Sequence, residues 1–414
     1  MRKIYSTLDI GSSYIKLVVG EFLGGNLHVL CALKEKTLGF RNNQITDREK
    51  LISCINKLLD NASNTLNFKI TKFIVNIPCD YNDFKLTEYT LNIDNEDGKI
   101  TSNDILKVLQ DSSKEQVKET EELIACIPVI FRVGDNETEY PLGKKGKTLS
   151  LKSIIVTTNK KTVYDIVKLL EACDVKVVDI TTTGLVNYYN YKNNEFDKKN
   201  TVIVNIGGST TNVSIFNKGI FINNVCLDIG VNTILKDIAE KYNLRKKEAI
   251  FLLENLALAS KKNADSLEEV KVNNIEQKEI VVNQVELSEI VNKVLIEMLK
   301  NIKSNINYLT KKEISYIIIT GGLAELKDLV IPLKSIFGNI AKIGYINDLG
   351  ARSTIYSTSI GMLRFFNDKL DIRGRDYKML SDDEEEMLLN SNNNSLQGNN
   401  TGILGKVFNY FFDN

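Results

Sequence analysis

The sequence predicts an α/β protein in which two similar domains face each other. Two segments about two hundred residues apart, 6–20 and 202–216, share one pattern: an apolar strand, a polar residue, a turn of small residues and a second strand with alternating apolar positions. Glycine in such a turn permits close backbone approach, so the N–H groups of the turn can surround a phosphate. Two such hairpins facing each other would hold a polyphosphate from both sides. The copies differ at one place, where the first has Asp9 and the second has Asn205.

Length and composition limit the classes of protein to which the chain can belong. The 414 residues suffice for two or more domains, and Lys plus Arg (53) equals Asp plus Glu (53), so no bias toward nucleic acid exists. The six cysteines lack the paired spacing of a metal or redox site, and the sole histidine, His28, makes histidine catalysis improbable. No stretch approaches about eighteen consecutive apolar residues and the N-terminus lacks a signal-peptide core, so we expect neither a membrane span nor secretion.

Apolar periodicity predicts the elements in turn. Strands are expected at 3–33, with turns at 11–13 and 24–26, and at 73–77, 86–93, 125–133, 153–158, 176–180, 201–221 and 316–320. Helices are expected at 47–66, around 105–109, and at 160–173, 230–242, 246–259, 285–309 and 354–366. The helix at 285–309 is the longest, with an apolar stripe formed by Leu287, Ile290, Val294, Met298 and Ile302.

Two segments depart from this pattern of alternating strands and helices. Residues from about 80 to 151 interrupt the first domain, because the pattern of buried strands and helices resumes after them. Near the C-terminus an acidic run at 381–386 and a stretch rich in Asn, Ser and Gly at 390–401 have the composition of a disordered linker.

Three motifs in order carry a resemblance to a known superfamily. They are the hairpin with Asp9, the hairpin with Gly207 and Gly208, and the late Ile-Ile-Ile-Thr-Gly-Gly-Leu at 317–323. Together they resemble the phosphate-1, phosphate-2 and adenosine motifs of the actin-like ATPases over residues 1–370. The resemblance implies an actin-like two-domain ATPase fold made of duplicated ribonuclease-H-like domains.

The position of the insert and the tail narrow the resemblance to the FtsA family of bacterial cell-division proteins. The insert lies between the strands at 74–77 and 153–158, where FtsA carries its distinctive subdomain, and the segments at 142–151, 173–180, 230–235 and 320–323 also resemble FtsA. The resemblance implies a first domain (1–80, 152–198 and 354–378) with an inserted subdomain (81–151). It implies a second domain (199–233 and 307–353) with a small subdomain (234–306). A disordered linker (379–401) and a membrane-targeting amphipathic helix (402–414) would follow.

By this resemblance the chain binds ATP and Mg²⁺. The backbone N–H groups of both hairpin turns would bind the β- and γ-phosphates, and Lys16 would add a positive charge beside them. Two glycines of the late motif would let the adenosine lie against the backbone. These residues are Gly11, Ser12, Ser13, Gly207, Gly208, Ser209, Thr210, Thr211, Gly321 and Gly322. The alternative for each turn is an ordinary tight hairpin.

Two departures from the superfamily concern hydrolysis. Carboxylates at the positions of Asp9 and Asn205 help to hold hydrated Mg²⁺, and Asn205 has no negative charge. Relatives place Glu or Gln near Thr183 to orient the attacking water, and a threonine hydroxyl is too short for that reach. We therefore expect no confident catalytic residue and at most a weak ATPase.

The C-terminal segment predicts a membrane anchor. Apolar residues at helical spacing form one face of a short amphipathic helix: Ile403, Leu404, Val407, Phe408, Phe411 and Phe412. The alternative is a terminal helix that docks on the protein's own core. A single tail would bind weakly, so several tails engaged by polymerisation would bind better.

The resemblance also implies partners and a location. They are FtsZ, other copies of the chain in an actin-like filament, membrane lipids and later division proteins, at the cytoplasmic side of the membrane at the division septum. Lys293 and Glu297 on the long helix could contact FtsZ, or could form an ordinary solvated pair. The alternatives to an FtsA-like role are a pilus-assembly protein of the PilM type and a sugar or acetate kinase-like enzyme.

Overall fold

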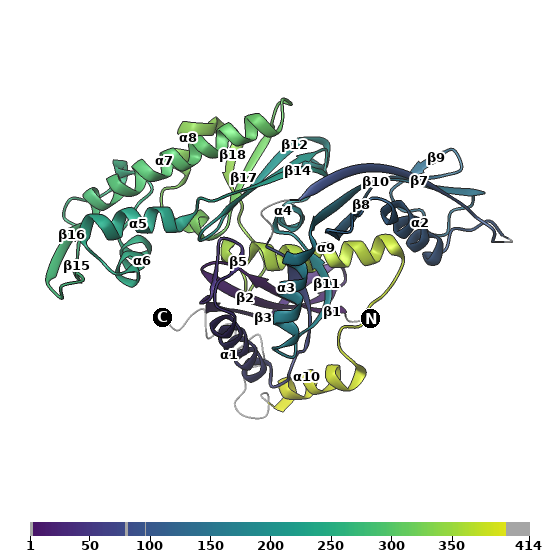
Figure 1. Cartoon of the computed structure of the whole chain (residues 1–414), viewed down its shortest axis with the longest axis horizontal. Coiled ribbons are helices and arrows are strands. Elements are labelled where there is room, and N and C mark those ends of the chain that lie inside the picture. Colours follow the sequence, from purple (N-terminus) through teal and green to yellow (C-terminus); the bar gives the residue numbers. More distant parts are fainter. Residues whose placement is uncertain (1–2, 79–81, 96, 395–414) are drawn as a thin grey trace.

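The structure, a computed structural model, describes residues 3–78, 82–95 and 97–394. It has two domains, each built on a five-stranded mixed sheet with the same strand order (Figure 1). In each sheet three consecutive antiparallel strands are followed by two strands that run parallel to the first of them. The predicted duplication is therefore present.

The first domain carries both chain ends that the structure describes. Its sheet has the order β11-β6-β1-β2-β3, with helices α1 and α3 beside it and α9 against β1, β2 and β6. Its elements are β1 (Lys3–Ile10), β2 (Tyr14–Leu23), β3 (Asn26–Lys36), β4 (Phe40–Arg41), β5 (Gln44–Ile45), α1 (Arg48–Leu66), β6 (Lys72–Asn76), α3 (Lys160–Glu171), β11 (Lys176–Thr181), α4 (Thr183–Val186) and α9 (Ser357–Arg373).

The second domain repeats this plan and extends from it a helical subdomain with a small hairpin. Its sheet has the order β14-β13-β12-β17-β18, and α7 crosses β13 and β14. Its elements are β12 (Asn200–Ile206), β13 (Thr211–Asn217), β14 (Ile220–Leu227), α5 (Val231–Tyr242), α6 (Lys246–Asn255), β15 (Glu269–Asn273), β16 (Glu279–Asn283), α7 (Gln284–Leu309), β17 (Tyr316–Thr320), α8 (Val330–Phe337) and β18 (Ala341–Ile343). Helix α6 ends at Asn255, four residues before the predicted end at 259.

The insert forms a sheet of its own beside the first domain (Figure 1). Its elements are β7 (Asp83–Asn92), α2 (Ser102–Lys114), β8 (Glu121–Val133), β9 (Asn136–Thr138) and β10 (Thr148–Asn159). A separate apolar cluster, which includes Ile105 and Phe131, fills the space between this sheet and α2. The long strand β10 leads from this cluster back into the main core.

Short 3-10 turns join several elements. They are η1 (Asn187–Asn190), η2 (Phe196–Lys198), η3 (Lys261–Asn263), η4 (Gly322–Glu325), η5 (Gly338–Ile340) and η6 (Thr354–Tyr356). Aromatic stacking beside η1 joins the domains below the cleft, since the rings of Tyr188 and Phe216 lie 4.2 Å apart. Of the helices described, none is long and apolar enough to cross a membrane.

The acidic segment differs from the expectation of a disordered linker over 379–401. Asp382–Asn394 form helix α10, next to the first domain (Figure 1). Ser381 and Glu384 cap its start reciprocally, since the Glu384 N–H donates to Ser381 Oγ and the Ser381 N–H to Glu384 Oε2. Acidic side chains in the first turn favour a helix, and Met379 and Leu388 are buried against the domain. The predicted membrane helix at 402–414 lies outside the described residues.

Candidate functional site

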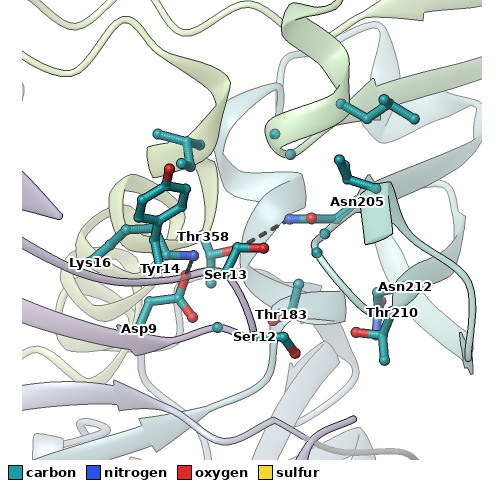
Figure 2. A pocket seen from close by; sticks show the side chains of 18 of the residues that line it. Asp9, Ser12, Ser13, Tyr14, Lys16, Thr183, Asn205, Thr210, Asn212 and Thr358 are labelled. Atoms are coloured by element: carbon teal, nitrogen blue, oxygen red, sulfur yellow. Dashed lines mark hydrogen bonds and ion pairs between the residues drawn. The ribbon is translucent and has the colours of Figure 1, made fainter. Parts of the chain in front are cut away.

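A cavity of about 520 Å³ lies between the two domains, lined by both predicted hairpin turns. Figure 2 shows Asp9, Tyr14 and Lys16 on one side of it and Asn205, Thr210 and Asn212 on the other. The turns have the same backbone geometry, because the Gly11 N–H donates to the Tyr14 carbonyl at 3.2 Å and the Gly207 N–H to the Thr210 carbonyl at 2.9 Å. The two copies of the motif therefore face each other across the cavity.

Glycine is required where the turns approach each other. A Cβ atom at Gly208 would lie 2.1 Å from Ser13 Oγ, so a side chain there would force the hairpins apart. Behind the second turn, a Cβ atom at Gly230 would lie 2.6 Å from the carbonyl oxygens of Gly207 and Gly208. The first contact brings the two turns together, and the second holds the Gly207–Gly208 turn against the start of α5 within its own domain.

In each domain the strand register aligns a row of polar side chains on adjacent strands of the sheet, on the face toward the cavity. In the first domain Asp9 pairs with Asn76 and Lys16, and Lys16 pairs with Lys34. Residues directly opposite each other on adjacent strands point to the same face. Consistent with this, all four line the cavity.

The second domain has an equivalent row without charge. Asn205 pairs with Thr320 and Asn212, and Asn212 pairs with Cys226. Asn205, Asn212 and Cys226 line the cavity. Every charge in the two rows therefore belongs to the first domain.

Asp9 is buried, and each of its carboxylate oxygens has a partner. Its Oδ2 lies 2.5 Å from Lys16 Nζ, and its Oδ1 accepts a hydrogen bond from Asn76 Nδ2 at 2.9 Å. The Thr183 hydroxyl donates to Asn76 Oδ1 at 3.2 Å, so the network reaches the start of α4. Thr183 thus lies on the cavity wall and holds Asn76 in place.

Asn205 joins the two domains. Its Nδ2 donates at 3.3 Å to the hydroxyl of Thr358, at the start of α9, which also accepts from Asn187 Nδ2 at 3.4 Å. Its Oδ1 faces Gly321, whose φ of +88° and lack of Cβ leave room for it, because a Cβ atom there would lie 2.5 Å from that oxygen. The substitution of aspartate by asparagine thus supplies an N–H donor between the halves.

The far end of the cavity is less polar and suits a base. Gly321, Gly322 and Leu323 form one wall, while Leu253 and Ala257 of the α6 region form another. On the rim, burial and the nearby Glu254 carboxylate raise the pKa of Tyr14. Tyr14 and Glu254 come from different domains, so the rim is also shared between them.

The structure brings most of the predicted site residues together. Those that line the cavity are Asp9, Gly11, Ser12, Ser13, Lys16, Thr183, Asn205, Gly207, Gly208, Thr210, Gly321 and Gly322. Two others do not: Ser209 Oγ accepts from Asn232 Nδ2, and the buried Thr211 hydroxyl donates to the Ile229 carbonyl. Thr211 alternates with Asn212 at the start of β13 and lies on the opposite face of the strand, whereas Ser209 lies in the turn before β13.

Sequence reasoning missed several lining residues: Tyr14, Lys34, Asn76, Asn212, Glu254 and Thr358. Tyr14 and Asn212 lie within the two hairpin motifs, so the motif itself was a signal for them. Asn76 ends a predicted strand next to Pro78, at the edge of the sheet where Asp9 ends β1.

The donor groups that line the cavity fit a polyphosphate better than they fit Mg²⁺. Lys16, Lys34 and the two small-residue turns fit a polyphosphate. The described carboxylates that line the cavity are Asp9, Glu254 and Glu325, and Glu325 Oε1 already accepts from the Thr354 N–H at 2.9 Å. Within the described ranges, no three His, Cys, Asp or Glu side chains form a group that could hold a metal. Asp9 is the one residue predicted to contact a hydrated Mg²⁺, and its charge is paired with that of Lys16.

The other predicted contact sites lie elsewhere. Lys293 and Glu297 are exposed on one face of α7, four residues apart, and no ion pair joins them in the part of the chain that the structure describes. The predicted lipid-binding residues from Ile403 to Phe412 fall outside the described residues.

Family comparisons agree with the two kinds of domain. A family described as "Cell division protein FtsA" matches residues 202–361, and one described as "SHS2 domain inserted in FTSA" matches residues 84–157. The second match covers most of the insert sheet, from β7 to β10.

Relatives match nearly the whole chain. FtsA of Bacillus subtilis (strain 168) is 22% identical over 90% of this chain and 86% of its own length, and FtsA of Escherichia coli (strain K12) is 22% identical over 88% and 90%. Two solved structures share the fold. MreB5 of Spiroplasma citri bound to ADP has a TM-score of 0.55 and 12% identity, over 90% of this chain and 99% of that one. The PilM-PilN type IV pilus biogenesis complex has a TM-score of 0.57 and 12% identity, over 87% of this chain and 98% of that one. The two facing hairpins, the inserted sheet and these relatives together show that the chain belongs to the FtsA family of actin-like cell-division proteins.

Proposed function

We propose that this chain binds ATP between its domains and acts as a membrane tether for the division ring rather than as an enzyme. The observation that carries the proposal is the cavity between two equivalent glycine turns, in a member of a cell-division family. MreB5 of Spiroplasma citri, which shares the fold, has been solved with ADP and with AMPPNP. The phosphates would lie between the turns, and the base would lie between Gly321 and the α6 region.

Hydrolysis is proposed to be slow or absent. Asn205 and Thr183 are neutral, and their donors are directed to Thr358 and Asn76. Neither side chain has the carboxylate that would accept a proton from an attacking water. Loss of a positioning group in phosphoryl transfer costs orders of magnitude in rate. ATP would then act as a structural ligand that holds the two domains together.

The remaining steps of the proposal concern assembly. The chain would polymerise into actin-like filaments at the cytoplasmic face of the membrane, where tails from several copies act together. FtsZ would dock on the small subdomain beside α7, and later division proteins would be recruited from there. The exposure of Lys293 and Glu297 is compatible with such a contact.

Co-sedimentation tests the tether directly. The full chain, FtsZ and vesicles that contain anionic lipid are mixed with and without ATP, and we expect FtsZ to sediment with the vesicles only when the chain is present. Removal of residues 402–414 should abolish vesicle binding and leave FtsZ binding intact. Unchanged lipid binding by that truncation would contradict the tail as the anchor.

A charge change on α7 tests the FtsZ contact. Lys293→Glu should weaken co-sedimentation with FtsZ about tenfold without altering vesicle binding, because an interface charge at an exposed position changes association and not the fold. Lys303→Glu on the same helix is the matched control, since Lys303 Nζ donates to the Ile336 carbonyl on another face. An equal loss in both variants would contradict a specific contact.

A kinase-like enzyme remains the second candidate of another class. It is less favoured because the cavity offers one carboxylate, Asp9, beside the phosphate turns, and that carboxylate is paired with Lys16. The likeness to PilM rests on the fold alone, while the sequence relatives quoted above are FtsA proteins.

A further inference from the structure

The two halves of the cleft differ in charge more than in shape. The row in the first domain contains Asp9, Lys16 and Lys34, and the equivalent row in the second domain contains only neutral side chains. Lys16 and Lys34 are direct cross-strand neighbours on β2 and β3 and both line the cavity. Two ammonium groups therefore lie beside the first phosphate turn.

Lys34 is held toward this site by its surroundings. Its Nζ lies 4.9 Å from the centre of the Tyr14 ring, and Tyr14 directly follows the turn. A cation above an aromatic face is stabilised without losing its ability to donate hydrogen bonds on the open side. Lys34 can thus reach a phosphate oxygen while Tyr14 limits its other conformations.

Lys16 can contact Asp9 and a phosphate at the same time. An ammonium group has three donors, and one of them is directed to Asp9 Oδ2 at 2.5 Å. With Lys16 on one oxygen and Asn76 on the other, the Asp9 carboxylate is already neutralised by an ammonium group, so a hydrated metal ion gains less from it than from an unpaired carboxylate. The facing residue, Asn205, contributes no charge to compensate for this.

We propose that this site binds the polyphosphate of a nucleotide without a divalent cation, with Lys16 and Lys34 supplying the positive charge that Mg²⁺ would otherwise supply. The inference rests on the proposed function, since it concerns how the same cavity holds ATP. It assigns Lys34 as a phosphate-binding residue and Asn205 as the residue that makes the metal dispensable. Hard divalent cations prefer charged oxygen ligands, and the two facing strand rows contain one carboxylate, Asp9, where the superfamily pattern has two.

The test compares ATP binding by the full chain, measured by calorimetry, in excess EDTA and in excess Mg²⁺. We expect the two dissociation constants to agree within about threefold. Binding in Mg²⁺ that weakens more than about tenfold in EDTA overturns the inference and leaves the proposed function intact. Absence of ATP binding in both conditions overturns the proposed function.

Asn205→Asp is the sharpest variant, because it restores the second carboxylate and changes little else in shape. We expect its ATP affinity to fall about tenfold in EDTA, by repulsion between the carboxylate and the phosphates, and to recover in Mg²⁺. Equal affinity of this variant in EDTA and Mg²⁺ would show that residue 205 does not control metal dependence, and would overturn that part of the inference.

Lys34→Gln tests the second ammonium group, and Lys36→Gln is its matched control. Both lysines are exposed on β3 and the charge change is the same, but Lys36 does not line the cavity. In EDTA we expect about a fivefold to tenfold loss of ATP affinity for Lys34→Gln and less than about twofold for Lys36→Gln. Equal losses would mean a general charge effect and would overturn the assignment of Lys34.

Discussion

Asp9 and Asn205 occupy equivalent positions in the two sheets and have opposite roles in the cleft. Asp9 is a buried anion that holds Lys16 at 2.5 Å, whereas Asn205 is a neutral donor to Thr358 of the other domain. Compared with an aspartate at the same position, Asn205 has no negative charge and donates a hydrogen bond to the other domain. At the scale of single residues, these two roles support the proposal that the site binds a nucleotide and does not activate water.

Removal of Lys16 should destabilise the fold as well as the site. Lys16→Met leaves the Asp9 carboxylate, 4% exposed, without its counter-ion, and we expect a loss of about 3 kcal/mol of unfolding free energy. Lys57→Met, which breaks the exposed pair with Glu35 at 2.9 Å, should cost less than about 1 kcal/mol. Urea denaturation measures the free energy of unfolding of both variants. Equal losses would contradict a stabilising role for the buried Asp9–Lys16 pair.

Asp368 on α9 provides a prediction about pH. Burial raises the pKa of this carboxyl, as do Asp371, Asp197 and Glu139, against the opposing effect of Lys192 at 3.8 Å. Because the pKa in the folded state lies above the unfolded value, the stabilisation is complete below the unfolded pKa and is lost as pH rises through the folded pKa.

Asp368→Asn removes this titration. The variant should be more stable than the parent at about pH 7, by up to about 1 kcal/mol, and the difference should shrink as pH falls toward about 4. Urea denaturation at several pH values measures it. A difference that stays constant with pH would contradict the role of this half-buried carboxyl.

At the scale of elements, the register of the β2–β3 hairpin decides that Lys34 lies opposite Lys16 at the cleft. Counting back from the turn at 24–25 places Leu33 opposite Lys16, but a bulge between Val19 and Gly20 shifts the register by one residue and places Lys34 there instead. A shift of one residue exchanges the faces of a strand. The apolar pattern predicted the hairpin, and the position of the bulge was not readable from it.

Helix α10 shows a second case of an element that composition did not predict. The acidic and asparagine-rich residues favour solvent, and what holds the segment is the burial of Met379, Leu380 and Leu388 in the core of the first domain. The Met379 carbonyl also accepts a hydrogen bond from Lys72 Nζ at 2.7 Å. A few anchoring contacts thus order a segment whose average polarity indicates disorder.

Leu388→Ser should release α10 from the domain. Leu388 is 3% exposed and the adjacent Met387 is 59% exposed, so Met387→Ser is the matched control. Hydrogen exchange of residues 382–388 should become about tenfold or more faster in Leu388→Ser, which corresponds to the loss of about 1.5 kcal/mol or more of burial, and should be unchanged in the control. Equal protection in both variants would contradict docking through Leu388.

At the scale of the whole molecule, two domains meet through the turns at the cleft, the Asn205–Thr358 bond and the aromatic stack of Tyr188 on Phe216. A polyphosphate between the turns would add contacts to both halves at once. ATP should therefore stabilise the folded chain much more than a ligand that lacks phosphates.

Thermal unfolding measures this linkage. At about one hundred times its dissociation constant, ATP should add about 2.7 kcal/mol to the stability and raise the apparent Tm, while phosphate release stays near background. Adenosine at the same concentration is the control and should give a much smaller shift. Equal shifts by the two ligands would contradict a role for the phosphate turns, and rapid phosphate release would contradict slow hydrolysis.

The sequence by itself determined the duplicated hairpins, the glycine turns, the interrupting subdomain and the family. Each of these features depends on residues that are close together along the chain. Only the tertiary structure decided which side chains share the cleft. Asn205 and Thr358 are 153 residues apart and Thr183 and Asn76 are 107 apart, and their contacts depend on how the domains meet. The place of Lys34 depends on a one-residue bulge, and the order of α10 depends on three buried side chains. Such effects arise from packing between distant segments, which local periodicity does not encode.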